Sequence, residues 1–210
     1  MHRVIRGVLV LAFVLATTAV FAQEDFSADI VNNKEGGNQG HARIYVTKDK
    51  WRIEGMSEGR MGGAVIANLA TEKNTILMPE RKMYMEFPMG QGPAGQRLTN
   101  FYRARDIDDA CSDWLKLPYN QGGSCHKLGS ETVNGRSTVK YEGTNSKGDT
   151  GYMWLDKKIA FPVKWENQKG GSGELQNIKE GSQPASLFEI PSDYQKFQMP
   201  AGMPNMPNRQ

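Results

Sequence analysis

The residues of this chain that could support chemistry are few, and the clearest are its only two cysteines, Cys111 and Cys125. In an oxidising compartment such a pair favours a disulfide, and two free, buried thiols are the alternative. A bridge would close a loop of about 15 residues and stabilise the fold by about 3 kcal/mol in the chain-entropy model. We expect the bridge.

The histidines offer little catalytic potential. His41 follows a glycine-rich turn and His126 adjoins Cys125. A cysteine–histidine nucleophile needs a free thiol beside a base, but neighbours on a strand point to opposite faces. The sequence also lacks serine-hydrolase, zinc-protease, phosphate-loop and dinucleotide motifs. We therefore expect both histidines to be ordinary polar residues at strand ends, and we expect no enzymatic activity.

Methionines and carboxylates give two weaker signals. Asp108 and Asp109 could pair as acid and base. In the first turn of a helix, however, their negative charges more simply interact favourably with the helix dipole. Met83-x-Met85 and Met203-x-x-Met206 have thioether spacings that suit cuprous ion. Alternatively, the first pair lines the apolar face of a strand and the second lies in a low-complexity tail. We expect no metal and no cofactor, and keep cuprous-ion binding as an alternative.

The N-terminus is typical of a cleavable export signal. It begins with a short positive head that contains His2, Arg3 and Arg6. An apolar run from Val8 to Val20 follows and ends at the small-residue site Val20-Phe21-Ala22. A membrane-spanning helix needs about 20 apolar residues, so this run predicts cleavage after Ala22. No cysteine follows the site, so we expect no lipid anchor.

The remaining chain is long enough for one domain with a hydrophobic core. We divide it into a signal peptide at 1–22, a domain at 23–198 and a disordered tail rich in Met and Pro at 199–210. Loss of the signal reduces Lys+Arg from 26 to 24, against 23 Asp+Glu. The mature chain is nearly neutral, and no basic stripe indicates nucleic acid.

Most of the domain alternates apolar and polar residues in short segments, which predicts strands. Thr47-Lys48-Asp49-Lys50 and Asn134-Gly135 are hairpin turn signals. Pro162 cannot donate a ladder hydrogen bond, so its strand is expected to be an edge strand or bulged there. We count about ten or eleven strands with no βαβ alternation, which predicts a mainly β, strongly curved or barrel-like antiparallel sheet. The expected strands are 42–46, 51–54, 65–69, 75–78, 83–87, 128–133, 136–142, 152–155, 159–165 and 174–178.

One helix is expected between the two groups of strands. The segment from Pro88 to Asn100 is rich in Gly and Pro and predicts a mobile loop. A helical stripe follows, and it predicts a helix from Asp106 to Leu117. The bridge would pin this helix to the sheet as a lid. Near the C-terminus, Leu187–Phe197 has enough apolar residues to dock on the domain. The helical stripe consists of Ile107, Ala110, Cys111, Trp114 and Leu115.

Large apolar residues share one face of the predicted strands and could line a concave binding surface. Methionine is adaptable and suits surfaces that accept variable apolar shapes. With Ile107 and Trp114 from the lid, they are our candidate ligand-binding residues. Alternatively, they simply fill the core. The strand residues are Trp51, Ile53, Met83, Met85, Phe87, Phe161, Val163 and Trp165.

Four stretches of the sequence resemble periplasmic lipoprotein carriers of the LolA/LolB type. Within that superfamily, the resemblance is strongest to an uncharacterised exported domain. They are Val46–Glu54, Ala67–Phe87, Gly129–Tyr141 and Tyr152–Trp165. The resemblance implies a periplasmic, unclosed antiparallel β-barrel covered by helices. It also implies an apolar cavity, which in the carriers receives acyl chains of lipoproteins. The cysteine pair and the Met/Pro tail depart from the carriers.

Three hypotheses follow for function. The first is an exported, non-enzymatic protein that binds a lipid, acyl chain or other apolar ligand, since each buried CH₂ contributes about 0.8 kcal/mol. The second is an envelope interaction or sensor module with a fully packed core and a protein partner. The third is cuprous-ion binding. An apolar cavity of about 300 Å³ or more under the helix would favour the first over the second.

Overall fold

The computed structural model describes residues 24–33, 39–55, 63–89, 91, 102–117 and 120–197. These residues form one twelve-stranded sheet in the order β12-β6-β5-β4-β3-β2-β1-β11-β10-β9-β8-β7. The expected signal peptide, the loop at 92–100 and the tail at 199–210 lie outside the described residues. The strands are β1 Phe26–Asn33, β2 Gln39–Val46, β3 Lys50–Glu54, β4 Ala64–Asn68, β5 Lys73–Met78, β6 Met83–Pro88, β7 Ser124–Val133, β8 Arg136–Thr144, β9 Thr150–Asp156, β10 Pro162–Asn167, β11 Ser172–Glu180 and β12 Gln195–Lys196.

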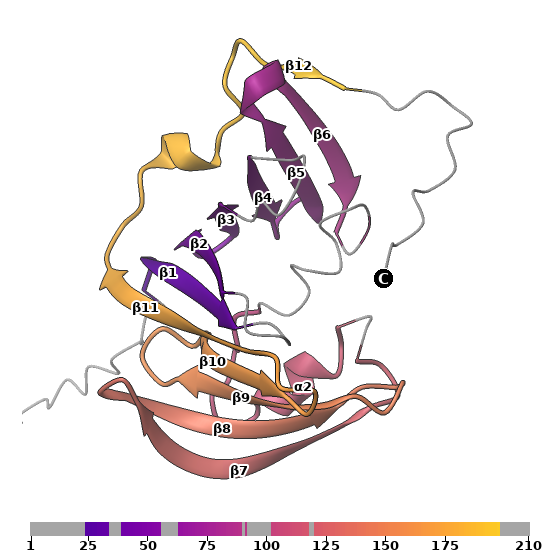
Figure 1. The fold of residues 1–210 in the computed structure, drawn as a ribbon, viewed down its shortest axis with the longest axis vertical. Coiled ribbons are helices and arrows are strands. Elements are labelled where there is room, and N and C mark those ends of the chain that lie inside the picture. The colour runs from indigo at the N-terminus through magenta and orange to yellow at the C-terminus, as the bar shows by residue number, and fades with distance from the viewer. Residues whose placement is uncertain are drawn as a thin grey trace, which may run out of the picture.

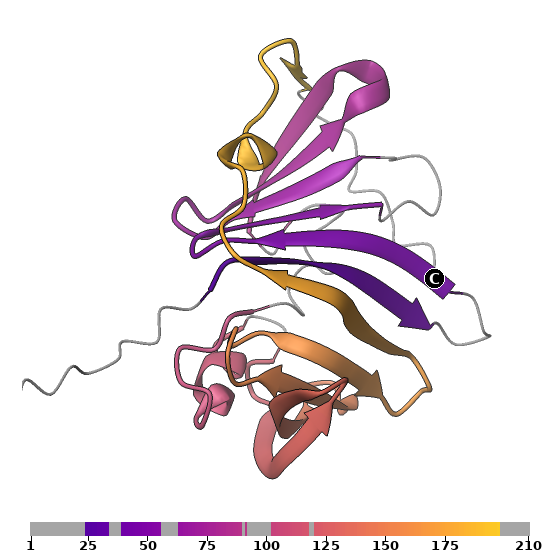
Figure 2. The same ribbon diagram turned by 90° about the vertical axis from the view of Figure 1, so that its left-hand side faces the viewer.

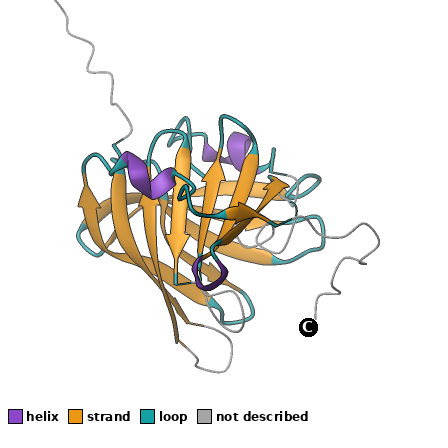
Figure 3. Ribbon diagram, turned by 90° about the horizontal axis from the view of Figure 1, so that it is seen from above, coloured by secondary structure: helices purple, strands orange, loops and turns teal. Residues whose placement is uncertain are grey.

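The sheet bends into two arms (Figure 1). Strands β2 to β6 form the upper arm and β7 to β10 the lower arm, and the antiparallel pair β1·β11 joins them. The ends of the sheet, β12 and β7, do not pair with each other, so the curve stays open. Viewed from above, the strands wrap around one concave side (Figure 3). The prediction of a mainly β, curved, unclosed sheet is confirmed, although β12 pairs with β6 in parallel.

Local sequence accounts for the turns. Asn134 and Gly135 both have positive φ, 50° and 77°, as a two-residue hairpin between β7 and β8 requires. In the β2–β3 turn the Thr47 hydroxyl accepts the backbone N–H of Lys50 at 3.0 Å. The ladder between β9 and β10 shifts register after Pro162. The bulge expected there is present, on a strand paired at both edges.

The structure has twelve strands against the ten or eleven expected, and two expected boundaries were wrong. The first strand, β1, was not predicted, although it pairs with both β2 and β11. Strand β10 begins at Pro162, and the preceding residues 159–161 belong to a turn. Helix α2 spans only Ala110–Trp114 and not Asp106–Leu117. None of the described helices has the length and apolar character needed to cross a bilayer.

The sheet is apolar on both sides of the upper arm. The larger cluster occupies the concave side and includes Phe26, Ile44 and Phe161. A second cluster covers the opposite, convex side of β4 and β5, where Phe188 packs on Ile66 and others. We call residues 184–197, which carry this contact, the C-terminal strap.

The C-terminal strap runs beside the outer side of the upper arm (Figure 2). It contains the 3₁₀ helix η2, Ala185–Phe188, and ends in β12. The Arg52 guanidinium donates to the carbonyl of Leu187 at 2.8 Å, and Lys82 pairs with Asp193 at 3.0 Å. The expectation that this segment docks on the domain is confirmed.

Candidate ligand-binding face

Most of the predicted ligand-binding residues belong to, or pack against, the concave cluster. Trp51, Ile53, Phe161 and Val163 are members of it, and Phe87, Ile107, Trp114 and Trp165 are half-buried around it. Met83 and Met85 share a strand face with Phe87 because they alternate along β6. The structure therefore brings the set together on one face. Whether that face binds a ligand remains a prediction.

The centre of the concave side is packed with aromatic rings. The ring of Phe161 meets Phe26 and Trp51 edge-to-face, with centroids 5.2 and 5.7 Å apart. Phe161 is completely buried. Such pairs stabilise a core beyond the area they bury, so this part of the concave side is core.

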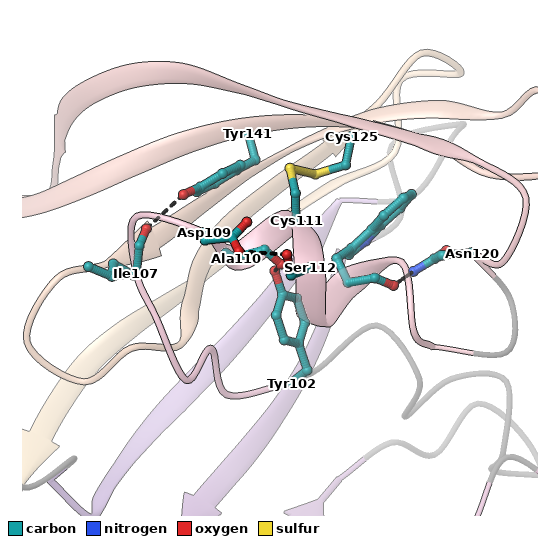
Figure 4. Close-up of a disulfide and its surroundings, with 10 residues drawn as sticks. Tyr102, Ile107, Asp109, Ala110, Cys111, Ser112, Asn120, Cys125 and Tyr141 are labelled. Atoms are coloured by element: carbon teal, nitrogen blue, oxygen red, sulfur yellow. Dashed lines mark hydrogen bonds between the residues drawn. A yellow bond between two sulfur atoms is a disulfide. The ribbon is translucent and has the colours of Figure 1, made fainter.

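The segment expected as a lid lies on the lower arm (Figure 4). The Cys111–Cys125 disulfide joins α2 to β7, with Cα atoms 5.4 Å apart, as predicted. The hydroxyl of Tyr141 donates to the carbonyl of Ile107 at 2.7 Å, and that of Tyr102 donates to the carbonyl of Ala110 at 3.4 Å. Burial raises the pKa of Tyr102. The disulfide and the Tyr141 bond fasten this segment to β7 and β8, and the Tyr102 bond links two parts of the segment itself.

The helix begins late because carboxylates stabilise non-helical turns before it. The Asp106 carboxylate accepts the backbone N–H of Asp108 at 2.8 Å, a local bond that competes with helix formation. Asp109 accepts the Ser112 hydroxyl at 2.6 Å. The Lys127 ammonium, 2.6 Å from Asp108, lowers the pKa of that carboxyl. These carboxylates thus take part in a turn, a hydroxyl hydrogen bond and an ion pair.

The upper arm presents a second apolar face towards the concave side. Val65, Leu69, Phe87 and Met89 are only partly buried there. An antiparallel sheet usually has one apolar face and one polar face. Here the C-terminal strap covers one apolar face of β4 and β5. The other face carries these partly buried side chains, and Phe87 is the predicted residue among them.

Sequence analysis missed one polar residue on this face. Asn74 is 1% exposed and lies between Ala67 of β4 and Phe87 of β6. Both atoms of its amide lack a hydrogen-bond partner, as does Nε1 of Trp51. The apolar run of β5 begins after Asn74, so periodicity leaves this residue outside the strand, and only the register shows that it faces inward.

Two hollows lie on the outer surface, and neither is the apolar cavity anticipated under the helix. One, of about 430 Å³, is bordered by polar groups that include Asp29, His41 and Arg43. Asn177 donates to Asp29 at 2.8 Å and, with the Arg43 guanidinium, lowers the pKa of that carboxyl. The second, of about 420 Å³, surrounds Arg136 and neighbours on β11. The arginine of each hollow forms ion pairs, Arg43 with Asp29 and Arg136 with Asp156 and Glu180.

No set of three or more His, Cys, Asp or Glu that could hold a metal ion occurs in the described part of the chain. Both His41 and His126 are exposed. Met83 and Met85 lie on one face of β6, whereas Met203 and Met206 lie outside the described residues. Cuprous-ion binding therefore stays a prediction.

Comparison of sequences identifies no family: no protein-family model matches the chain, and no curated protein matches it. Comparison of structures does find similar folds. An uncharacterised conserved protein from Thermus thermophilus has 13% sequence identity and a TM-score of 0.53. The match covers 84% of this chain and 91% of that protein. The two proteins share a fold.

More distant matches include proteins of the predicted superfamily. A LolA superfamily protein, NE2245 from Nitrosomonas europaea, has 10% identity and a TM-score of 0.36, over 80% of this chain and 90% of that one. MucB in the MucA/MucB complex of Pseudomonas aeruginosa has 15% identity and a TM-score of 0.48, over 82% of this chain. The match spans 58% of the MucB chain.

Proposed function

We propose that this chain is an exported, non-enzymatic protein of the bacterial periplasm that binds an apolar ligand, such as a lipid or acyl chain, on the concave face of its upper arm. The expected signal peptide and the cysteine pair support export. The motif-poor sequence and the paired state of the carboxylates support a binding role.

The observation that carries the proposal is the apolar character of both faces of β4 to β6. The chain uses its C-terminal strap to bury one face, with Phe188 only 8% exposed. The concave face keeps partly buried apolar side chains, among them Val65 and Phe87. Grouped apolar surface that is left open to solvent marks interaction sites, and we propose that these partly buried side chains form such a site.

The packed centre supports the second candidate, an envelope interaction or sensor module. Phe161 and Trp51 fill the middle of the half-barrel, so no ligand is needed to complete that part of the core. The ligand in the first proposal therefore lies nearer to β6 than the sequence alone suggested. Cross-linking in intact cells that captures a protein partner, and no lipid, would support this second candidate.

A fluorescent apolar probe tests the first proposal. N-phenyl-1-naphthylamine becomes bright in an apolar site, and we expect the mature protein to bind it in competition with lauryl chains. Phe87→Asp places a charge on the half-buried rim of the face and should weaken binding at least tenfold, because burying an unpaired charge is costly.

The matched control is Leu128→Asp. Leu128 is an exposed apolar residue, 51% exposed, on β7 at the opposite end of the sheet. Its substitution should leave probe affinity unchanged, and circular dichroism checks that both variants fold. Equal binding by the two variants, or no binding by the unmodified protein, would contradict the proposal.

A further inference from the structure

One row of side chains crosses the concave face of the upper arm from β1 to β6. Strand register places them opposite one another, so they form a continuous line across the sheet. All are apolar except Asn74. The row consists of Phe26, Val46, Trp51, Ala67, Asn74 and Phe87.

Two members of this row have polar atoms with no partner. Trp51 is 5% exposed and Asn74 is 1% exposed, yet the indole Nε1 and both amide atoms make no hydrogen bond. Buried polar groups in folded proteins are nearly always paired. In the part of the chain that is described, the other such side chain is Arg103, which still donates to the Glu24 carbonyl at 2.7 Å.

The two residues lie on the same face of the sheet, two strands apart. Ala67 separates them on β4, and neighbouring strands lie about 4.8 Å apart, so the Trp51 and Asn74 backbones are about 10 Å apart. Ala67, the small residue between them, is 2% exposed. Phe87, next to Asn74 on the β6 side, is half-buried, so the row becomes more exposed at that end.

We propose that Trp51 and Asn74 anchor the head of an acyl ligand whose head group is an amide; this inference rests on the proposed function. The indole N–H and the Asn74 NH₂ donate, and the Asn74 carbonyl accepts. A secondary amide supplies both the acceptor and the donor that complete this set. An ester has no donor, and a carboxylate brings a charge that is costly to bury. The alkyl chain then extends towards Met85 and Phe87 on β6.

A pair of probes that differ by one group tests the inference. N-methyldecanamide and methyl decanoate have the same chain and shape, but only the amide has an N–H. We expect calorimetry to give about tenfold tighter binding of the amide, the effect of roughly one net hydrogen bond. Asn74→Leu should abolish this preference, because it removes the carbonyl acceptor that only the N–H of the amide can use.

Two further variants separate the polar role from packing. Trp51→Phe keeps a ring but removes the N–H, and should reduce the amide preference in part. Thr75→Val, at the next position on β5 and on its opposite, convex face, should leave the preference unchanged. Asn74→Leu should also raise the melting temperature of the unliganded protein, since it removes a buried, unpaired amide.

The outcomes distinguish the inference from the proposed function. If both probes bind equally well to the unmodified protein, the amide anchor is refuted while apolar ligand binding stands. A lower melting temperature for Asn74→Leu would also refute the anchor, because the amide would then have a structural partner. If neither probe binds, the proposed function itself fails.

Discussion

Removal of the Cys111–Cys125 disulfide should destabilise the fold by a predictable amount. The bridge joins residues 14 apart in sequence, and the chain-entropy model gives about 3 kcal/mol for a loop of that length. For a protein of this size, 1 kcal/mol corresponds to about 2–4 °C. Cys111→Ala with Cys125→Ala should therefore lower the melting temperature by about 6–12 °C.

Scanning calorimetry of the double variant and the oxidised protein measures this loss. The hydroxyl of Tyr141 still holds the carbonyl of Ile107 in the variant, so we expect a folded protein whose lower arm unfolds more readily. Hydrogen exchange should accelerate in residues 102–117 more than in β4 and β5. A change below about 1 kcal/mol, or equal acceleration in both arms, would refute the view that the bridge fastens this segment.

Three other changes test the ion pairs, the lower arm and the strap. The Lys158 ammonium is the main cause that lowers the pKa of Glu180 from 4.5 to about 2. Because the pKa is lower in the folded chain, its stabilisation is present above pH 4.5 and is lost as the pH falls to 2. Glu180→Gln should flatten urea-measured stability over that interval, and an unchanged pH profile would count against the ion pair. Gly143→Ala would place a Cβ 2.7 Å from the ring of Trp114. It should cost about 1–3 kcal/mol in urea unfolding, which a second change, Trp114→Ala, would relieve; a neutral single variant would show that the indole does not pack there. Phe188→Ala should cost about 3 kcal/mol and expose the strap to limited proteolysis, and unaltered cleavage would argue against the docked strap.

Periodicity was enough to predict most of the sheet. Alternation of apolar and polar residues indicated which side chains of β3 and β6 share a face. Asn134-Gly135 located the β7–β8 hairpin. These signals are local, because strand alternation and positive φ are properties of neighbouring residues. The disulfide was also predictable, since only one pairing of two cysteines exists.

Features that depend on long-range pairing were missed. Strand β1 pairs with β11, far away in sequence, and its Asp29 lies on the polar face between the inward-facing Ala28 and Ile30. Asp29 is matched by Arg43 on β2 and by Asn177 at the bulge in β11, which no short window can show. The helix was predicted too long because its apolar stripe is real, while the Asp106 side chain favours a turn.

The residues of the candidate face were predicted as a set. Which of them belong to the packed core and which to an accessible surface was not predicted. Alternation places Trp51 and Phe161 on the inside, but it cannot separate core from binding surface. That distinction depends on which strands curve over one another and on where the C-terminal strap lies. Asn74 was missed for the same reason, because its inward position follows from register with Ala67.

The central claim is that the concave face of the upper arm holds an apolar ligand. Native mass spectrometry of the mature protein, purified without detergent from the periplasm of the cells that produce it, tests this most directly. We expect a bound acyl-chain or lipid mass that is absent from the folded Phe87→Asp variant and retained by Leu128→Asp. A folded protein that carries no added mass, and gains none when acyl chains are supplied, would contradict it.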